Sequence, residues 1–178
     1  MDTSQPSTER ENRLIAGRYE LLEPIGSGGA GVVYRARDTT LRNEIVAVKL
    51  IHTFLQNDEA LMRRLKNEVL ITRRLASPHI VQVYDFGFAG GAPFVVMEFI
   101  EGRTLREMLS KRNKEENPVS DLLSVLKQLM KALAVAHAAR VAHRDIKLEN
   151  ILFDRAQTLK LADFGIARLL ETQRALGR

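Results

Sequence analysis

Apolar and β-branched residues occur in short stretches along the first half of the chain, and polar or Gly-rich segments separate these stretches. This pattern predicts β-strands. The last two predicted strands should form a hairpin, because Gly90 and Gly91 lie between them. The predicted strands lie at residues 19–25, 32–37, 44–51, 80–86 and 93–99. Residues 58–75 instead carry apolar side chains three and four positions apart, which predicts a helix. We therefore expect a five-stranded antiparallel sheet with one helix over residues 17–101, after a polar, disordered leader at residues 1–16.

The second half of the chain, residues 102–178, has a helical pattern of apolar positions before it returns to short strands and loops. A short helix is predicted at 104–111 and a long one at 120–140, with Ser120 as the N-cap of the long helix. Together the two halves predict an α+β protein with a sheet-rich first domain and a mostly helical second domain.

The composition excludes several classes of protein. The 178 residues contain no Cys, which excludes disulfides and Cys-ligated metals and favours the cytoplasm as the compartment. No apolar run is long enough to cross a bilayer, and the polar N-terminus lacks the pattern of a signal peptide. The net charge is +5, but acidic residues alternate with most of the basic ones. A solvated helix face explains the densest basic cluster, within residues 63–74, better than nucleic-acid binding does.

The first candidate site is the Gly-rich loop Gly26-Ser27-Gly28-Gly29-Ala30-Gly31, which fits the pattern G-x-G-x-x-G. A dinucleotide-binding loop would continue into a helix, and a Walker A loop needs Gly-Lys-Ser/Thr, whereas here Val32 and Val33 continue as a strand. We interpret the loop as a strand–turn–strand flap whose backbone N–H groups can approach phosphates, because glycine has no Cβ. An ion pair with Glu68 on the helix would hold Lys49, in the next strand, toward the same phosphates.

The second candidate site is His143-Arg144-Asp145 with the polar residues that follow it. Asp145 can accept the proton of an attacking hydroxyl group, and Lys147 can neutralise charge on a transferred phosphoryl group. Asn150 and Asp163 offer the oxygen ligands that Mg²⁺ prefers. Each residue alone is ordinary loop chemistry, but chance is a poor explanation for all of them together in this order and at these spacings.

These motifs resemble those of the protein kinase family, and within it the bacterial kinases of eukaryotic type that phosphorylate Ser and Thr. The resemblance covers residues 18–166 and includes the glycine loop, Lys49, the catalytic segment around Asp145 and the motif Asp163-Phe164-Gly165. Lys147, two residues after Asp145, is typical of the Ser/Thr-directed subclass. The resemblance implies a kinase-like fold and transfer of the γ-phosphoryl group of ATP to Ser or Thr hydroxyls of protein substrates.

The resemblance also implies roles for single residues. Asp145 would be the catalytic base with Lys147 beside it, and Lys49, paired with Glu68, would hold the phosphates of ATP. Asn150 and Asp163 would bind Mg²⁺, and His143 would be structural, packing beneath Phe164. The implied ATP-binding residues are Ile25, Gly26, Ser27, Gly28, Gly31, Val33, Ala47, Lys49, Met97, Glu98, Ile100 and Leu152.

Three other features have a simpler interpretation. Asp85-Phe86-Gly87 repeats the sequence of Asp163-Phe164-Gly165. It precedes the catalytic segment and lies in the predicted hairpin, so we interpret it as sheet geometry. The four His residues lie on separate elements without the spacing of a metal site. Thr172 is the only hydroxyl residue after Gly165, and an unmodified side chain explains it better than a phosphorylation site does.

The chain ends thirteen residues after Gly165, where the family continues into further helices. We therefore expect an incomplete C-lobe and a helix at 120–140 that exposes apolar residues, so that the chain binds a docking partner or a second copy of itself. A non-catalytic nucleotide-binding or regulatory module is the alternative to an active kinase, and a remnant without function is a third possibility. Lys147 disfavours a kinase for small molecules.

Overall fold

The computed structural model describes residues 14–52, 59–110 and 118–164, and these residues form two compact units. The first unit contains the described residues up to Arg63 together with Val83–Phe99. The second contains Arg64–Gln82 and the described residues from Ile100 onward. Most of helix α2 (Glu59–Thr72) therefore groups with the second unit, whereas the sequence pattern assigns all of residues 17–101 to the first domain.

The segment after α2 explains this difference. Leu75 and Ile80 are buried in the hydrophobic core of the second unit. Ile80 also forms a parallel bridge with Leu161, and the N–H of Val81 donates to the Leu161 carbonyl oxygen at 3.0 Å. Burial of these side chains and their backbone hydrogen bonds favour the second unit, although the strand pattern of residues 80–86 predicts the first sheet.

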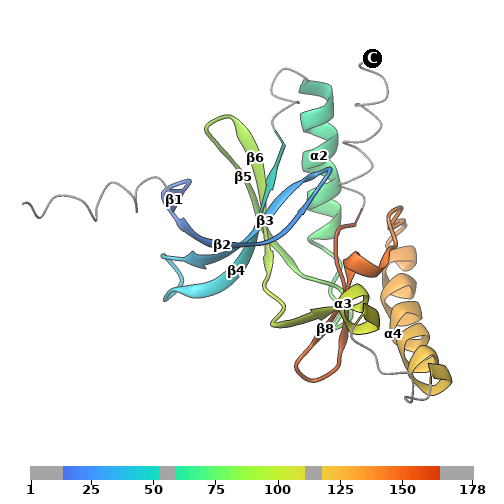
Figure 1. Cartoon of the computed structure of the whole chain (residues 1–178). Helices are drawn as coiled ribbons and strands as arrows, with labels where there is room; N and C mark the ends of the chain where they lie inside the picture. The colour runs from blue at the N-terminus through green and yellow to red at the C-terminus, as the bar shows by residue number, and fades with distance from the viewer. Residues whose placement is uncertain (1–13, 53–58, 111–117, 165–178) are drawn as a thin grey trace, which may run out of the picture. The chain divides into compact units, whose positions relative to one another are not determined.

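A curled antiparallel sheet forms the first unit (Figure 1), with its strands in the order β1-β2-β3-β4-β6-β5. The strands are β1 (Leu14–Ile15), β2 (Tyr19–Gly28), β3 (Gly31–Asp38), β4 (Glu44–Ile51), β5 (Val83–Ala89) and β6 (Ala92–Glu98). Five of them correspond to the predicted strands. The sixth, β1, lies in the predicted leader and pairs with β2 because Ile15 packs against the buried cluster around Tyr19 and Phe94.

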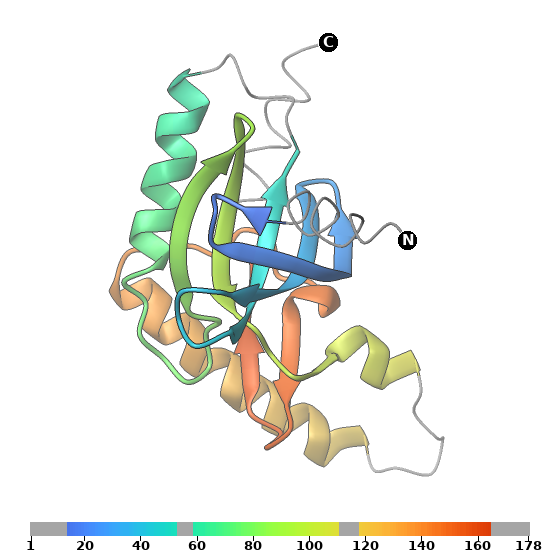
Figure 2. The ribbon, with the colours of Figure 1, turned by 90° about the vertical axis from the view of Figure 1, so that its left-hand side faces the viewer.

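The second unit combines helices with a three-stranded sheet of order β7-β8-β9. Its elements after α2 are β7 (Gly102–Thr104), α3 (Leu105–Ser110), α4 (Pro118–Ala138), the 3₁₀ helix η1 (Leu148–Asn150), β8 (Ile151–Asp154) and β9 (Leu159–Leu161). Helix α4 packs against β9 and runs beside the β8–β9 hairpin (Figure 2). It begins at Pro118, which is tolerated in a first helical turn, so Ser120 is a helical residue and the prediction that it is the N-cap is wrong.

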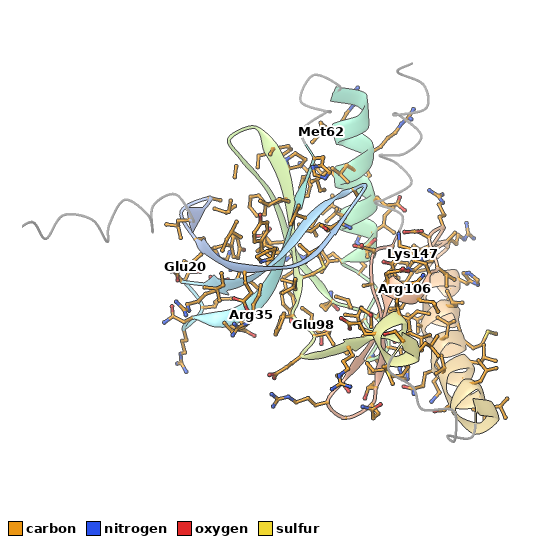
Figure 3. The ribbon with its side chains drawn as sticks, viewed as in Figure 1. Glu20, Arg35, Met62, Glu98, Arg106 and Lys147 are labelled. Carbon is orange, nitrogen blue, oxygen red and sulfur yellow. The ribbon has the colours of Figure 1, made fainter. Side chains whose placement is uncertain are left out.

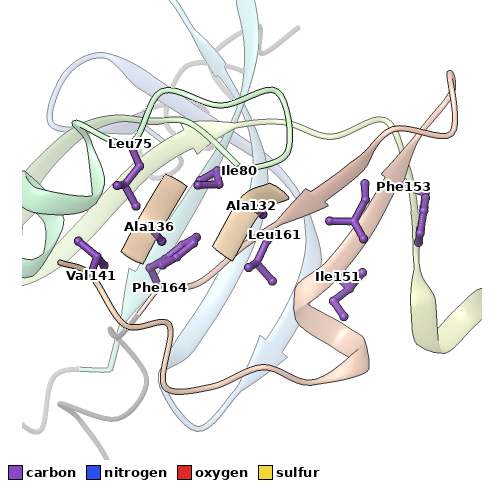
Figure 4. Packing of buried hydrophobic residues seen from close by; sticks show 10 residues of the cluster. Leu75, Ile80, Ala132, Ala136, Val141, Ile151, Phe153, Leu161 and Phe164 are labelled. Atoms are coloured by element: carbon purple, nitrogen blue, oxygen red, sulfur yellow. The ribbon is translucent and has the colours of Figure 1, made fainter. Parts of the chain in front are cut away.

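The core of the second unit forms between α4 and the strands (Figure 4). Ala132 and Ala136 of α4 are both fully buried, and such small side chains let the helix approach the buried Leu161 and Phe164 closely. The side chain of Gln128 adds a polar contact, because its Oε1 accepts the backbone N–H of Leu159 at 2.8 Å. The β8–β9 hairpin, which lies between the catalytic segment and Asp163, is thus fixed to α4.

The opposite side of α4 presents apolar side chains to solvent. Leu122, Leu123, Leu126 and Met130 are each between 44% and 65% exposed. This agrees with the expectation that the long helix exposes apolar residues. Within the described residues, no helix has the length and apolar character needed to span a lipid bilayer.

Candidate active site

The catalytic segment, which contains His143, Arg144 and Asp145, follows directly after α4, whose C-terminal end is well defined. Arg140 has a left-handed backbone, with φ of 59°, and its N–H donates to the His137 carbonyl oxygen at 2.9 Å. The N–H of Val141 donates to the Ala136 carbonyl oxygen at 2.8 Å. These two bonds form a Schellman motif, which commonly has a hydrophobic contact beside it. Here Val141 and Ala136 are both buried in the same core, so the segment that follows starts from a fixed position.

His143 is buried and joins two parts of the site. Its Nε2 lies 2.7 Å from the Ala162 carbonyl oxygen, and its Nδ1 lies 3.3 Å from the backbone nitrogen of Asp145. The carbonyl oxygen can only accept and the N–H can only donate, so the ring must be the neutral tautomer with its proton on Nε2. Burial lowers the pKa of His143 and favours the same neutral form. The ring packs against Phe164 with centroids 4.5 Å apart, which confirms the predicted structural role.

Asp145 is held by two neighbouring side chains. Its Oδ2 accepts a hydrogen bond from Lys147 Nζ at 2.7 Å and another from Asn150 Nδ2 at 3.0 Å. Asn150 Nδ2 also donates to the Asp145 backbone carbonyl oxygen at 2.8 Å. The hydrogen bond to Asp145 raises the pKa of Lys147, so the ammonium stays charged beside the carboxylate. The structure thus brings three of the predicted catalytic and metal-binding residues into direct contact (Figure 3 labels Lys147).

Asp163 is placed beside this cluster through its neighbour Ala162. The N–H of Ala162 donates to the Asn150 carbonyl oxygen at 2.9 Å, while its own carbonyl oxygen accepts from His143. Asp163 has a left-handed backbone, with φ of 62°, which Asp adopts more readily than most residues. An amide oxygen from Asn150 and a carboxylate from Asp163 fit the oxygen preference of Mg²⁺. The described residues contain no cluster of three His, Cys, Asp or Glu side chains that could hold a metal in another way.

In the first unit, the glycine loop is the predicted strand–turn–strand. Gly26 pairs with Val33, and Gly28 pairs with Gly31 across the turn between β2 and β3. Gly31 has φ of 150°, and a Cβ there would lie 2.0 Å from the Leu50 carbonyl oxygen, so the fold itself requires glycine at this position. A Cβ at Gly28 would have no neighbour within 4 Å, and one at Gly26 would meet only Val33 Cβ at 4.0 Å. The fold leaves the glycines at 26 and 28 unexplained.

Lys49 lies in the middle of β4 between Val33 and Val95, and it is only 3% exposed. Ala47 and Met97 are buried partners on β4 and β6. The remaining predicted ATP-binding residues of this unit are Ile25, Ser27 and Glu98. The other predicted residues, Glu68, Ile100 and Leu152, belong to the second unit. The ion pair between Lys49 and Glu68 therefore stays a prediction, as does the ATP-binding set as a whole.

The repeated motif Asp85-Phe86-Gly87 lies in β5, as the hairpin interpretation predicts. The hydroxyl of Tyr19 donates to Asp85 Oδ2 at 3.1 Å, and Arg18 forms an ion pair with the same oxygen at 3.6 Å. A Cβ on Gly87 would lie 2.6 Å from the ring of Phe94, so packing within the sheet explains this glycine. Contacts within the sheet therefore account for the aspartate and the glycine of this motif.

Sequence reasoning missed two supports of the catalytic segment. The Ala162 carbonyl oxygen orients His143, and no residue type marks it because it is a backbone atom. Arg106 of α3 forms an ion pair with Glu149 of η1, 43 residues away along the chain. A partial signal exists for α3 itself. Thr104 and Glu107 form a capping box at its start, and the spacing T-x-x-E is readable in the sequence.

Comparison with known proteins gives a consistent picture. The family model described as "Protein kinase domain" matches residues 19–177. Serine/threonine-protein kinase PrkC of Bacillus subtilis is 39% identical over 160 residues, which are 90% of this chain and 24% of PrkC. Serine/threonine-protein kinase PknL of Mycobacterium tuberculosis is 41% identical over 158 residues, 89% of this chain and 39% of PknL. The chain thus spans only a quarter to two fifths of the length of these relatives.

A solved structure agrees in fold. The crystal structure of the PknI kinase domain of Mycobacterium tuberculosis superposes with a TM-score of 0.74 at 28% sequence identity. The superposition covers 86% of this chain and 61% of the PknI chain.

Proposed function

This chain belongs to the protein kinase family, and from this premise we propose that it is the catalytic part of an ATP-dependent serine/threonine kinase of the cytoplasm. The reaction is transfer of the γ-phosphoryl group of ATP to a Ser or Thr hydroxyl of a protein substrate. The observation that carries the proposal is the contact of Lys147 and Asn150 with a single carboxylate oxygen of Asp145. The names of PrkC and PknL, which are similar to this chain over most of its length, support the choice of Ser and Thr.

In the proposed mechanism, Asp145 orients the substrate hydroxyl and takes its proton as the hydroxyl oxygen bonds to the γ-phosphorus. The bond from the γ-phosphorus to the β–γ bridging oxygen breaks, which leaves phosphorylated Ser or Thr and ADP. Lys147 fixes the carboxylate and places a positive charge beside the transferred group. Mg²⁺, held by Asn150 and Asp163, would neutralise phosphate charge. The His143 hydrogen bond to the Asp145 backbone keeps the base in place.

The glycine loop supports ATP as the phosphate donor. The fold explains Gly31 but not Gly26 or Gly28, whose missing side chains leave open space beside an exposed backbone. A ligand that approaches this backbone closely would account for both glycines. Buried Lys49, on β4, is the cation proposed to bind the phosphates.

Transfer of radiolabelled γ-phosphate from Mg²⁺-ATP to a library of Ser, Thr and Tyr peptides tests the proposal with the whole 178-residue chain. We expect Asp145→Asn to reduce transfer by roughly a hundredfold to ten-thousandfold, the usual effect of a general base. Asp85→Asn, which changes the aspartate of the repeated motif, is the matched control and should keep transfer at a temperature where it is folded. Equal loss in both variants, or transfer that persists in Asp145→Asn, would contradict the proposal.

A second proposed role concerns partners. The exposed stripe of Leu122, Leu123, Leu126 and Met130 on α4 is an apolar surface that costs free energy in water. We propose that this stripe associates with a second copy of the chain or with a docking partner. A non-catalytic regulatory module, the alternative to an active kinase, would also need such a docking surface. Mutation of Asp145 distinguishes the two roles, because phosphoryl transfer depends on Asp145 and association through the stripe does not.

A further inference from the structure

The ion pair between Arg106 and Glu149 lies next to the cluster of Asp145, Lys147 and Asn150 without being part of it. Arg106 is the second residue of α3, and α3 lies against η1, the short helix that carries Glu149 and Asn150. The two side chains are 59% and 45% exposed, so the pair is open to solvent. An exposed pair of this kind contributes little to the stability of a fold. Its position suggests a different use.

The Arg106 end of the pair is firmly anchored. Thr104 and Glu107 cap α3 reciprocally, with hydrogen bonds of 2.8 and 3.2 Å. The preceding strand β7 pairs with β8, and at Gly102 the two backbones approach so closely that a Cβ would lie 1.7 Å from the Phe153 carbonyl oxygen. Leu105 and Met108 of α3 pack against the core of the unit. The guanidinium of Arg106 therefore projects from a fixed support.

The Glu149 end lies among the charges of the site. Glu149 is two residues from Lys147, and each contributes to the electrostatic environment of the other. Lys147 donates to Asp145 at 2.7 Å, but Asp145 is not the only carboxylate within its electrostatic reach. A carboxylate at position 149 without a cation of its own would compete with Asp145 for the ammonium of Lys147. Arg106 supplies that cation.

We infer that Arg106 is a positioning residue of the catalytic segment. Its ion pair with Glu149 keeps that carboxylate from competing for Lys147, so that Lys147 stays hydrogen-bonded to Asp145. The inference rests on the proposed phosphoryl transfer, because Lys147 and Asp145 act in that reaction. It differs from a purely structural ion pair in one consequence. Loss of Arg106 creates a competitor for Lys147, whereas loss of Glu149 removes one.

The test compares kcat for phosphorylation of a Ser peptide in Arg106→Gln, Glu149→Gln and the double variant. We expect R106Q to lower kcat about twofold to fivefold, the range of one exposed ion pair, with little change in the KM for ATP. E149Q should lose less than R106Q, the double variant should match E149Q, and the conservative R106K should retain most of the activity. Arg155→Gln, which breaks the exposed ion pair of Arg155 with Glu101 in the same unit, is the control and should leave kcat unchanged.

Crystal structures of the wild-type chain and R106Q give a readout that does not need activity. Lys147 Nζ should lie within hydrogen-bond distance of Asp145 in the wild type and of Glu149 in R106Q. Equal loss of kcat in R106Q and E149Q, or Lys147 still on Asp145 in R106Q, would overturn the inference. A wild-type chain that transfers no phosphate would defeat the proposed function, and the two crystal structures would still decide this inference.

Discussion

The imidazole of His143 accepts the backbone N–H of Asp145 at 3.3 Å, so the position of the proposed base depends on a neutral histidine. The same ring donates from Nε2 to the Ala162 carbonyl oxygen at 2.7 Å. A protonated ring would have donors on both nitrogens and would lose the bond to Asp145. The protonation state of one buried side chain is therefore coupled to the geometry of the site.

We predict that the chain loses stability as the pH falls below about 6.5, the ordinary pKa of histidine. Burial lowers the pKa of His143 in the folded state, so the unfolded state binds the proton first. The free energy of unfolding should then decrease with falling pH by at most about 1.4 kcal/mol per pH unit for this one group. Urea unfolding between pH 7.5 and 5 measures the effect. His143→Phe should be less stable at pH 7 and have a flatter profile, since the other three His residues remain in both proteins.

A second prediction concerns Asp38, which is buried and accepts three hydrogen bonds from Arg18, the shortest at 2.6 Å. The bonds from Arg18, with those from Thr40, lower the pKa of Asp38 to about 2 from 3.8. The carboxylate therefore contributes about 2 kcal/mol of stability above pH 3.8, which is lost as the pH falls from 3.8 toward 2.

Asp38→Asn should accordingly lower the free energy of unfolding by about 2 kcal/mol at pH 7, and the two proteins should converge near pH 2. Glu23→Gln is the matched control, because it breaks the exposed ion pair of Glu23 with Arg35 and should cost less than about 1 kcal/mol. A pH-independent difference between Asp38→Asn and the wild type would show that the ionisation of Asp38 is not the cause.

The glycine loop offers a third test, in which Gly→Ala should affect stability at one position and ATP binding at another. Gly31→Ala should destabilise the first unit by about 3 kcal/mol or more, because the new Cβ would collide with the Leu50 carbonyl oxygen. Gly28→Ala should change stability by less than about 0.5 kcal/mol, since its Cβ meets open space. If the loop holds phosphates, Gly28→Ala should still weaken ATP binding, by about tenfold for one lost charged hydrogen bond. Thermal unfolding and nucleotide titration separate the two effects, and unchanged ATP affinity in Gly28→Ala would count against the loop as the phosphate site.

The fourth prediction concerns the apolar stripe of α4. Replacing Leu126 and Met130 together by Gln should reduce self-association of the chain, because both side chains are exposed and neither is needed in the core. Sedimentation velocity over a range of concentrations measures this. The matched control is Lys127→Gln with Lys131→Gln, which places the same side chains on the same helix outside the stripe. Equal association of all three proteins would remove the stripe as a self-association surface and leave only the docking partner.

The sequence was sufficient for most of the fold because its signals are local. Short stretches of apolar and β-branched residues mark the strands, and Gly90-Gly91 marks the hairpin between β5 and β6. Its failures also have physical causes. Leu14 and Ile15 form a strand only because the sheet offers a partner edge, and residues 80–82 leave the predicted strand because Ile80 pairs with Leu161. The bridge from Ile80 to Leu161 is a contact distant in sequence, which no local pattern encodes. Strand β1 pairs with its near neighbour β2, but it also depends on the packing of Ile15 against the buried cluster that includes the distant Phe94.

The candidate site divides in the same way. The spacing of Asp145, Lys147 and Asn150 predicts the cluster because all three lie within one short loop. The supports that cross between segments were not predictable from residue types. The Ala162 carbonyl oxygen that holds His143 is a backbone atom, and Arg106 reaches Glu149 from a separate helix. Motifs identify the groups that perform chemistry better than they identify the groups that position them.

Asn150 illustrates a chemical constraint that follows from its two hydrogen bonds to Asp145. Both acceptors are oxygens, so the amide must present its nitrogen to Asp145 and is left with a single oxygen, Oδ1, to offer a cation. A carboxylate at this position would offer a cation more charge, yet it has no proton to donate and would repel the base. The proposed metal site is thereby limited to the weaker, uncharged ligand at position 150, because the side chain proposed to bind the metal also restrains the carboxylate proposed to take the proton.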